Sequence, residues 1–368
     1  MAEHRFIIAN YSHTPTSGKV SWQSPSNIAL VKYWGKYGEQ KPMNASVSFT
    51  LKNSNTKTSL FFEKKDSEGF DFEVYLDGTR EISFEPKIQK FFERIQMYVP
   101  FIKQYKFRIE TSNSFPHSSG IASSASGMSA LALCLMDMEM QMLPEIFPAL
   151  QETDSNYFNK KASFLARLGS GSACRSIEGP LIIWGEHPEI ENSTHCFGTK
   201  YPYKIHENFE NYQDTILLVD KGEKQVSSTV GHNLMIDHPF AEQRFRQAKS
   251  NLSKLNAIFK DGDVPAFIKI VESEALSLHA MMLTSMPYFI LMKPNTLEII
   301  NRIWKFREET NSLVCFTLDA GANLHVLYPA GEKDKVLHFI ESELSQFCKN
   351  GEYIIDEAGL GAIKTTVS

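Results

Sequence analysis

The sequence predicts a two-domain protein of the α+β class. At 368 residues the chain is longer than the roughly 100–200 residues that one hydrophobic core usually supports. Strand-like and helix-like patterns intermix along it rather than following one repeating order. A polar, turn-rich stretch at 186–211 has the composition of a connection between domains. We therefore expect an N-terminal domain at 1–205 and a C-terminal domain at 206–368.

The N-terminal half is expected to begin as a β-sheet. Stretches of alternating or β-branched residues predict strands at 58–62, 70–76 and 105–110. Asp77-Gly78 directly follows the second of these stretches, and this dipeptide is typical of a tight turn between two strands.

Two Gly/Ser-rich segments interrupt the remainder of this half. The first, 117–127, precedes a stretch whose Ala, Leu and Met content predicts a helix at 128–140. The second, 169–172, follows a helix-like stretch and leads to an apolar strand at 181–184. The first segment is therefore expected to be a loop that leads into a helix N-terminus.

The C-terminal half mixes helical and extended patterns. Apolar residues at helical spacing predict four helices, and short β-branched or apolar stretches predict three strands. The helices are expected at 240–259, 264–282, 296–310 and 333–349, and the strands at 216–219, 313–318 and 324–328.

Composition limits the classes of function. The net charge is −5 and no basic tract is present, so nucleic-acid binding is not expected. Residues 1–23 lack the apolar run of a signal peptide, and no later run approaches the ~20 residues of a membrane span. The five cysteines are scattered and never spaced as CxxC, and the histidines form no zinc-binding pattern. We expect a soluble, cytoplasmic protein.

The segment 117–127 has the form of a phosphate cradle. Helix N-termini expose unpaired N–H groups and a partial positive charge, which suits phosphate oxygens. The segment lacks the GxxxxGK(S/T) pattern of a Walker loop and contains no lysine, so charge has to come from elsewhere or from Mg²⁺. Composition alone is equally compatible with a helix cap and a chain turn.

Five blocks of sequence together resemble one known family. The run from Pro116 to Gly127, PHSSGIASSASG, is similar to the phosphate loop of the GHMP kinase superfamily in its mevalonate 5-diphosphate decarboxylase variant. The other blocks occur in the order of that family: NIALVKYWGK at 27–36, GSGSACRS at 169–176, VSSTVG at 226–231 and DAGAN at 319–323.

The resemblance implies a fold and a reaction. The fold would be that of GHMP kinases, with an N-terminal α/β domain of the type seen in ribosomal translation proteins and a ferredoxin-like C-terminal domain. The reaction would transfer the γ-phosphoryl group of ATP to the tertiary hydroxyl of mevalonate 5-diphosphate. Loss of phosphate and carbon dioxide would then give isopentenyl diphosphate. ATP and Mg²⁺ would be required, and the family commonly forms homodimers.

The resemblance also assigns the ATP end of the site. Loop N–H groups and serine hydroxyls would hold the ATP phosphates, since phosphoryl transfer depends on positioning and charge neutralisation. Ser123 and Ser124 are the candidates for contact with Mg²⁺. The full nucleotide-binding set is Ser118, Gly120, Ala122, Ser123, Ser124 and Ser126.

Three residues are the catalytic candidates. Asp319 would face the tertiary hydroxyl, accept its hydrogen bond and later stabilise positive charge at the tertiary carbon. Arg175 could hold the substrate carboxylate through two hydrogen bonds, a geometry that lysine cannot copy. Lys32 would lie near both. Seen alone, an Asp-Ala-Gly turn or a lysine such as Lys32 is more often structural or solvated.

The remaining candidates concern the substrate. By the same resemblance Asn27 would contact the carboxylate end, and Asn323 would hold the Asp319 turn in shape. Each hydroxyl could equally be a cap or turn residue. The residues expected around the diphosphate are Tyr33, Lys36, Ser172 and Ser228.

Three alternatives stay open on sequence. One is a decarboxylase acting on mevalonate 5-phosphate, and departures from the family pattern at Tyr37-Gly38, 42–44 and Ala322 bear on that choice. A second is a small-molecule kinase of the same superfamily, although such kinases lack the combined Asp, Arg and Lys. A third is a noncatalytic nucleotide-binding protein, which predicts the loss of a reactive side chain; none is missing.

Overall fold

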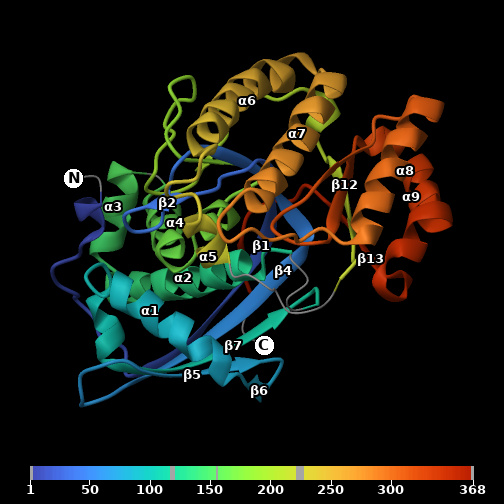
Figure 1. Ribbon diagram of the computed structural model, residues 1–368. Helices are drawn as coiled ribbons and strands as arrows, with labels where there is room; N and C mark the ends of the chain where they lie inside the picture. The colour runs from blue at the N-terminus through green and yellow to red at the C-terminus, as the bar shows by residue number, and fades with distance from the viewer. Residues whose placement is uncertain (1–2, 117–120, 155, 221–227, 366–368) are drawn as a thin grey trace.

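The computed structural model describes residues 3–116, 121–154, 156–220 and 228–365. It has the mixed α/β, two-part architecture predicted from the sequence (Figure 1). The N-terminal half is a large sheet with helices packed on one face, and the C-terminal half combines a smaller antiparallel sheet with long helices. Within the described residues, no helix is both long enough and apolar enough to cross a membrane.

Two long antiparallel strands form the backbone of the larger sheet. They pair from Ser17 with Glu63 as far as Val31 with Val47, and register shifts interrupt the ladder near Pro25 and near Val31. Strand order along the main path is β14-β1-β4-β7-β5-β6, with β8 and β9 continuing from β4. The strands are β1 (Ser17–Val31), β4 (Ser46–Lys64), β5 (Asp71–Leu76), β6 (Thr79–Arg80), β7 (Tyr105–Asn113), β8 (Leu181–Trp184), β9 (Thr199–Lys200) and β14 (Ile363–Lys364).

The predicted strands of this half are confirmed, but β1, the second longest strand after β4, was missed. The stretches at 58–62, 70–76, 105–110 and 181–184 correspond to parts of β4, β5, β7 and β8. Asp77 and Gly78 have φ values of 49° and 82°, the positive pair that a two-residue hairpin turn requires. Strand β1 contains Pro25 and several serines, so its composition does not predict a strand.

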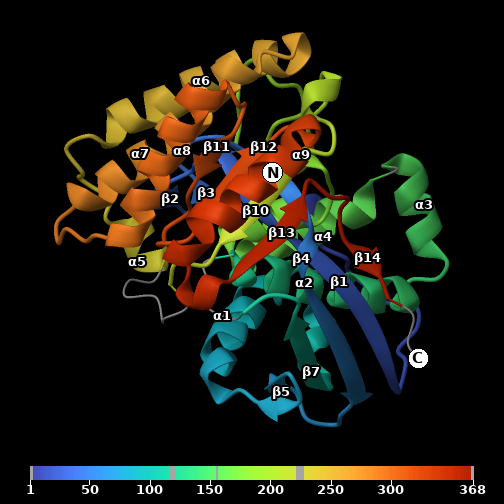
Figure 2. The same ribbon diagram turned by 90° about the vertical axis from the view of Figure 1, so that its right-hand side faces the viewer.

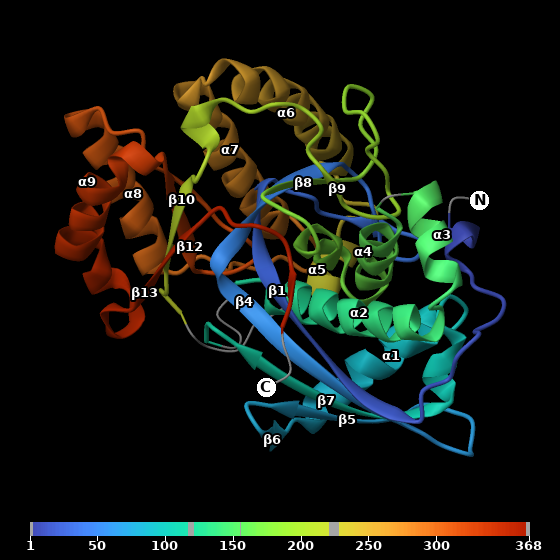
Figure 3. The same cartoon turned by 180° about the vertical axis from the view of Figure 1, so that it is seen from behind.

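Helices cover one face of this sheet (Figure 3). Helix α2 packs directly on β1 and β4, and α4 and α1 pack beyond it. Because it lies in the middle of this layer, α2 is apolar on nearly every side rather than along one stripe. The helices are α1 (Glu85–Ile95), α2 (Ser123–Met142), α3 (Ile146–Thr153) and α4 (Tyr157–Gly169). A short hairpin, β2 (Lys36–Tyr37) with β3 (Lys41–Pro42), follows β1.

The C-terminal half has an antiparallel sheet with strand order β11-β12-β10-β13. Helices α7 and α8 pack on β11, and α6 packs on α7 (Figure 2). The strands are β10 (Gln213–Leu217), β11 (Cys315–Thr317), β12 (Leu324–Tyr328) and β13 (Tyr353–Glu357), and the helices are α5 (Ser228–Asn233), α6 (Ala241–Asp261), α7 (Val264–Leu283), α8 (Pro294–Thr310) and α9 (Lys333–Phe339).

The predicted helix at 333–349 was wrong in its second half. Regular helix ends at Phe339, and a wider π turn, Ile340–Leu344, follows it. Val336, Ile340 and Leu344 are all fully buried. Because a regular α-helix has about 3.6 residues per turn, side chains four residues apart shift progressively around its axis. The wider π turn compensates for this shift, so these side chains stay on one face. The other helices and strands predicted in this half are confirmed with shifted ends.

An apolar core joins the two halves. Ile28 on β1 and Phe49 on β4 belong to the same buried cluster as Ile216, Phe259 and Phe267 of the C-terminal half. The chain end also returns to the first sheet, where β14 pairs with β1 (Figure 2). These contacts fix side chains from the two halves relative to one another. The domain boundary at 205/206 stays a prediction.

One fully buried ion pair joins α2 and α4, and it allows the cost of leaving a buried charge unpaired to be measured. The Lys161 ammonium lies 2.7 Å from the Glu139 carboxylate, and both side chains are fully buried. Lys161→Met would leave Glu139 buried without its counter-ion, so we expect urea unfolding to show a loss of about 3–5 kcal/mol. The neighbouring variant Lys160→Met removes an ion pair with Asp154 that is partly exposed, and should cost at most about 1 kcal/mol. Equal losses in both variants would contradict this account.

Candidate active site

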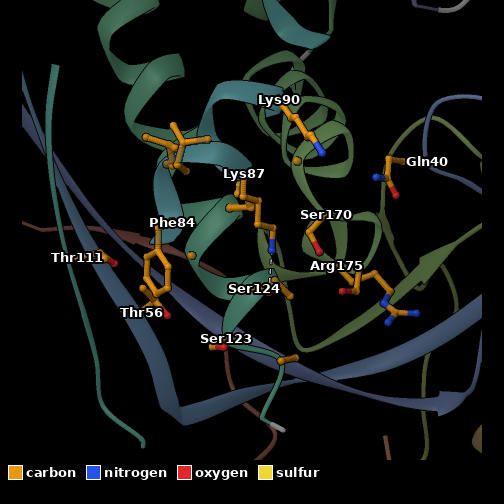
Figure 4. A pocket seen from close by; sticks show the side chains of 18 of the residues that line it. Gln40, Thr56, Phe84, Lys87, Lys90, Thr111, Ser123, Ser124, Ser170 and Arg175 are labelled. Atoms are coloured by element: carbon orange, nitrogen blue, oxygen red, sulfur yellow. Dashed lines mark hydrogen bonds between the residues drawn. The ribbon is translucent and has the colours of Figure 1, made fainter. Parts of the chain in front are cut away.

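A cavity of about 720 Å³ lies between the N-terminal motif, the start of α2 and the turn that contains Asp319. Figure 4 shows part of its lining. Of the residues predicted from sequence, those that line the cavity are Lys32, Tyr33, Lys36, Ala122, Ser123, Ser124, Ser172, Arg175 and Asp319. Ser118 and Gly120 lie outside the described residues, as does the side chain of Ser228 at the start of α5.

Lys32 and Asp319 form an ion pair at the base of the cavity. The Lys32 Nζ atom lies 2.8 Å from Asp319 Oδ1, with side-chain exposures of 2% and 34%. Burial alone would raise the pKa of the Asp319 carboxyl, but the charge and hydrogen bond of Lys32 outweigh it and hold this pKa below its ordinary value. Asp319 is therefore an ionised carboxylate that Lys32 orients and that still faces the cavity.

The turn around Asp319 is fixed from several sides. Gly321 donates its N–H to the Asp319 carbonyl at 2.8 Å, and His279 Nε2 lies 3.1 Å from the same oxygen. Since a carbonyl only accepts, His279 carries its proton on Nε2. Asn323 bonds both the N–H and the carbonyl of Asp220, at 2.8 and 2.9 Å. These bonds tie the residue that follows the turn to Asp220, and the role of Asn323 in holding the Asp319 turn stays a prediction.

Arg175 is buried at the side of the cavity, in the short helix Gly171–Ser176. Its Nη1 donates to Ser46 Oγ, and its Nε donates to Asn27 Oδ1 at 3.3 Å. Among the described residues, Nη2 has no protein partner. Two of the three guanidinium nitrogens are thus anchored, and the Nη2 group is available to an anion such as a carboxylate.

Asn27 lies behind Arg175 and outside the lining of the cavity. Besides accepting from Arg175, its amide donates to Ser176 Oγ at 2.8 Å and to the Ser172 carbonyl at 3.3 Å. In this geometry Asn27 orients Arg175. A direct contact with substrate, as predicted from sequence, would require one of these hydrogen bonds to break.

Tyr33 and Lys36 add a polar and a cationic group beside Arg175. The Arg175 guanidinium carbon lies 5.3 Å from the Tyr33 ring centroid, and Lys36 Nζ lies 5.9 Å from it. Burial, reinforced by the charges of Lys87 and Arg94, lowers the pKa of Lys36 to about 8. An ammonium destabilised in this way gains from contact with an anion.

Helix α2 begins at the cavity with an open N-terminus. The residue before it, Ala122, has a left-handed φ of 49° and provides no side-chain cap. This strained conformation turns the chain so that Ser123 and Ser124 line the cavity. Ser126 does not line it, because its hydroxyl is buried and bonded to Thr56 Oγ1 at 2.6 Å.

Sequence reasoning missed the basic face of α1. Lys87, Lys90 and Arg94 all line the cavity, and Lys87 Nζ donates to Ser124 Oγ at 2.8 Å (Figure 4). They supply the positive charge that the phosphate loop lacks. The signal was present, since positions 87, 90 and 94 share one face of a helix whose opposite face is apolar.

The donor set fits magnesium held mainly by phosphates. Within the described ranges, no three His, Cys, Asp or Glu side chains come close enough together to hold a metal ion. Ser123 and Ser124 supply hydroxyl oxygens at the cavity wall. Mg²⁺ keeps several waters and usually binds through few protein oxygens plus substrate phosphates, so these two residues could hold it only together with a bound nucleotide.

An uncapped helix N-terminus, a basic wall and an ion-paired carboxylate lie together in one cavity, an arrangement suited to an enzyme that binds phosphates and acts on an anionic substrate. Two family models match the chain: the diphosphomevalonate decarboxylase-like N-terminal domain over residues 24–195, and the mevalonate 5-diphosphate decarboxylase C-terminal domain over residues 215–364. The chain belongs to the diphosphomevalonate decarboxylase family.

Individual relatives agree with this assignment. Diphosphomevalonate decarboxylase from Saccharomyces cerevisiae is 28% identical over 336 residues, which cover 86% of this chain and 79% of the yeast protein. The mevalonate diphosphate decarboxylase structure from Enterococcus faecalis is 26% identical with a TM-score of 0.78, covering 95% of this chain and 100% of that one. The solved complex of MDDEF with MVAPP, AMPPCP and magnesium is 28% identical with a TM-score of 0.79 and the same coverage.

The lowered pKa of Lys36 predicts how anion binding depends on pH. Only the ammonium form attracts an anion, so affinity should be highest below pH 8 and fall as the pH rises through the pKa of about 8. Calorimetric titration with inorganic diphosphate from pH 7 to 9.5 measures this dependence. Lys36→Arg should hold its affinity to higher pH because arginine stays charged, and Lys36→Met should bind weakly throughout. A profile of Lys36→Arg identical to that of the wild type would exclude Lys36 as the titrating group.

Proposed function

We propose that this protein catalyses the ATP-dependent decarboxylation of mevalonate 5-diphosphate to isopentenyl diphosphate, with release of ADP, phosphate and carbon dioxide. The observation that carries the proposal is the Lys32–Asp319 ion pair, in which Lys32 is buried, beside Arg175 in a cavity that also contains the uncapped N-terminus of α2. Family membership over residues 24–195 and 215–364 supports it.

ATP would occupy the side of the cavity formed by the sheet, α1 and α2. Val74, Phe84 and Ile109 make an apolar surface suited to a purine base. The N–H groups at the start of α2 and the ammonium groups of Lys87 and Lys90 suit its phosphates. Magnesium would enter with the nucleotide at Ser123 and Ser124, where it would neutralise charge on the phosphates. The complex of MDDEF with MVAPP, AMPPCP and magnesium supports this combination of ligands.

The substrate would lie between Arg175 and the N-terminal motif. Arg175, anchored by Ser46 and Asn27, would hold the carboxylate through its free Nη2 group. Lys36 and Tyr33 would hold the diphosphate, with Ser172 beside them. Ser228 at the start of α5 completes the proposed set. This arrangement would place the tertiary hydroxyl near Asp319.

The chemistry follows from these positions. The Asp319 carboxylate would accept a hydrogen bond from the tertiary hydroxyl and orient its oxygen for attack on the γ-phosphorus, with ADP as the leaving group. The bond between the tertiary carbon and the phosphorylated oxygen would then break, with phosphate as the leaving group. Positive charge would develop at the tertiary carbon next to Asp319, and the electrons of the bond to the carboxylate would form the alkene as carbon dioxide leaves. Lys32 would keep Asp319 ionised and in place throughout.

The substrate is tested by measuring carbon dioxide release and ADP formation from purified protein with ATP and Mg²⁺. Mevalonate 5-diphosphate, mevalonate 5-phosphate and mevalonate are compared. Release from the diphosphate alone is expected. Release from the monophosphate alone would overturn the proposed substrate, and ADP without carbon dioxide would identify a kinase.

A cytoplasmic location and assembly as a homodimer are also proposed. The five cysteines are all free thiols, as a reducing compartment favours. The homodimer rests on the family resemblance of the sequence motifs. Size-exclusion chromatography with light scattering, at concentrations from micromolar upward, tests the assembly; a monomer over the whole range would refute it.

The role of Asp319 predicts the effect of one conservative substitution. Asp319→Asn keeps the shape of the side chain but removes the negative charge next to the reacting carbon. We expect kcat to fall by about 10²–10³ or more, the scale of other preorganised polar groups, while ATP binding changes little. The buried Lys32 ammonium loses its counter-ion, so the melting temperature should also fall. The control is Asp334→Asn, a carboxylate in the first turn of α9, which should leave kcat unchanged. Turnover of Asp319→Asn within a few-fold of the wild type would refute the assigned role.

A further inference from the structure

His232 on α5 is a buried side chain with no role in the reaction proposed above. Its ring lines the cavity and is 4% exposed. The backbone N–H of Gly35 donates to its Nδ1 atom at 3.0 Å. Because Nδ1 accepts, the neutral imidazole carries its proton on Nε2, and that N–H is a hydrogen-bond donor.

No protein acceptor for this donor occurs among the described residues. Two other buried histidines show how the fold satisfies both ring nitrogens. His238 accepts from Phe240 N–H at 3.1 Å, and its Nε2 lies 3.0 Å from the Met281 carbonyl. His187 bonds Glu189 N–H and the Lys249 carbonyl in the same way. A donor left unpaired at a buried position is costly, so Nε2 of His232 calls for an acceptor from a ligand in the cavity.

The surroundings identify the chemistry of that acceptor. The His232 ring stacks on Tyr33 with centroids 4.7 Å apart, and the same Tyr33 ring lies near Lys36 Nζ and the Arg175 guanidinium. Burial, and then the charges of Lys36 and Arg175, hold the pKa of His232 well below its ordinary value. The ring therefore stays neutral beside two cations, and a ligand drawn here by those cations is an anion rich in acceptor oxygens.

We propose that the Nε2–H group of His232 donates a hydrogen bond to a phosphate oxygen of the substrate diphosphate. This inference rests on the proposed function and extends its binding site from the N-terminal motif to α5. Through Nδ1 the same ring holds Gly35, one residue before Lys36. His232 thus links the backbone that positions Lys36 to the anion that Lys36 binds.

Two substitutions of His232 test the roles of its two ring nitrogens separately. His232→Asn can place an amide oxygen where Nδ1 accepts from Gly35, but it does not reach the position of Nε2. His232→Gln can place an amide N–H near Nε2. We expect His232→Asn to raise KM for mevalonate 5-diphosphate about tenfold, the loss of one hydrogen bond to a charged group, with kcat within a few-fold. His232→Gln should recover most of that loss. His238→Asn, a buried histidine with both nitrogens bonded to backbone, should leave KM unchanged.

A wild-type KM in His232→Asn would overturn the proposal. So would equal losses in the Asn and Gln variants, which would assign His232 a structural role only. Calorimetric binding of mevalonate 5-diphosphate to the wild type and to His232→Asn tests the contact without turnover. If the wild type releases no carbon dioxide, the proposed function fails, while a weaker calorimetric affinity of His232→Asn would still support the contact and an unchanged affinity would refute it.

Discussion

The ion pair between Lys32 and Asp319 depends on the way the two halves of the chain are joined. Lys32 directly follows β1, and Asp319 lies in the turn between β11 and β12. Helices α6 and α7 hold the backbone of Lys32: Glu274 accepts its N–H at 2.9 Å, and Arg244 donates to its carbonyl at 3.1 Å. With the apolar core shared by both halves, these bonds keep two charges together where burial would otherwise penalise each of them.

The wall of the cavity is rich in basic residues, although the molecule as a whole carries a net negative charge. The chain carries a net charge of −5, yet the cavity wall presents Lys36, Lys87 and Lys90 together with Arg175. Attraction of anions is therefore local, as expected when a pocket rather than a surface binds phosphates. Within this wall, Asp319 is a negative group placed where the proposed reaction develops positive charge. In the proposed reaction the same cavity would bind phosphates and stabilise a developing cation.

Much of the fold and site could be predicted because their signals are local. The Asp77-Gly78 turn, the apolar strand at 324–328 and the helix that follows the Gly/Ser segment each depend on neighbouring residues. What escaped prediction depends on tertiary packing. Strand β1 is stabilised by pairing with β4 rather than by its own composition, and Asn27 faces Arg175 only because the helix Gly171–Ser176 packs there. The role proposed for His232 follows from the stacking of α5 on Tyr33, a contact between distant parts of the sequence.

In the proposed mechanism, Lys32 acts on the reaction through Asp319. The most direct measurement is single-turnover formation of ADP and carbon dioxide by Lys32→Met with ATP, Mg²⁺ and mevalonate 5-diphosphate. Because the Asp319 side chain is 34% exposed, the cavity can solvate it when its partner is lost, and the fold should persist. Both products should fall together by about a hundredfold or more, with substrate binding and melting temperature nearly retained. Carbon dioxide formation within a few-fold of the wild type would contradict this mechanism.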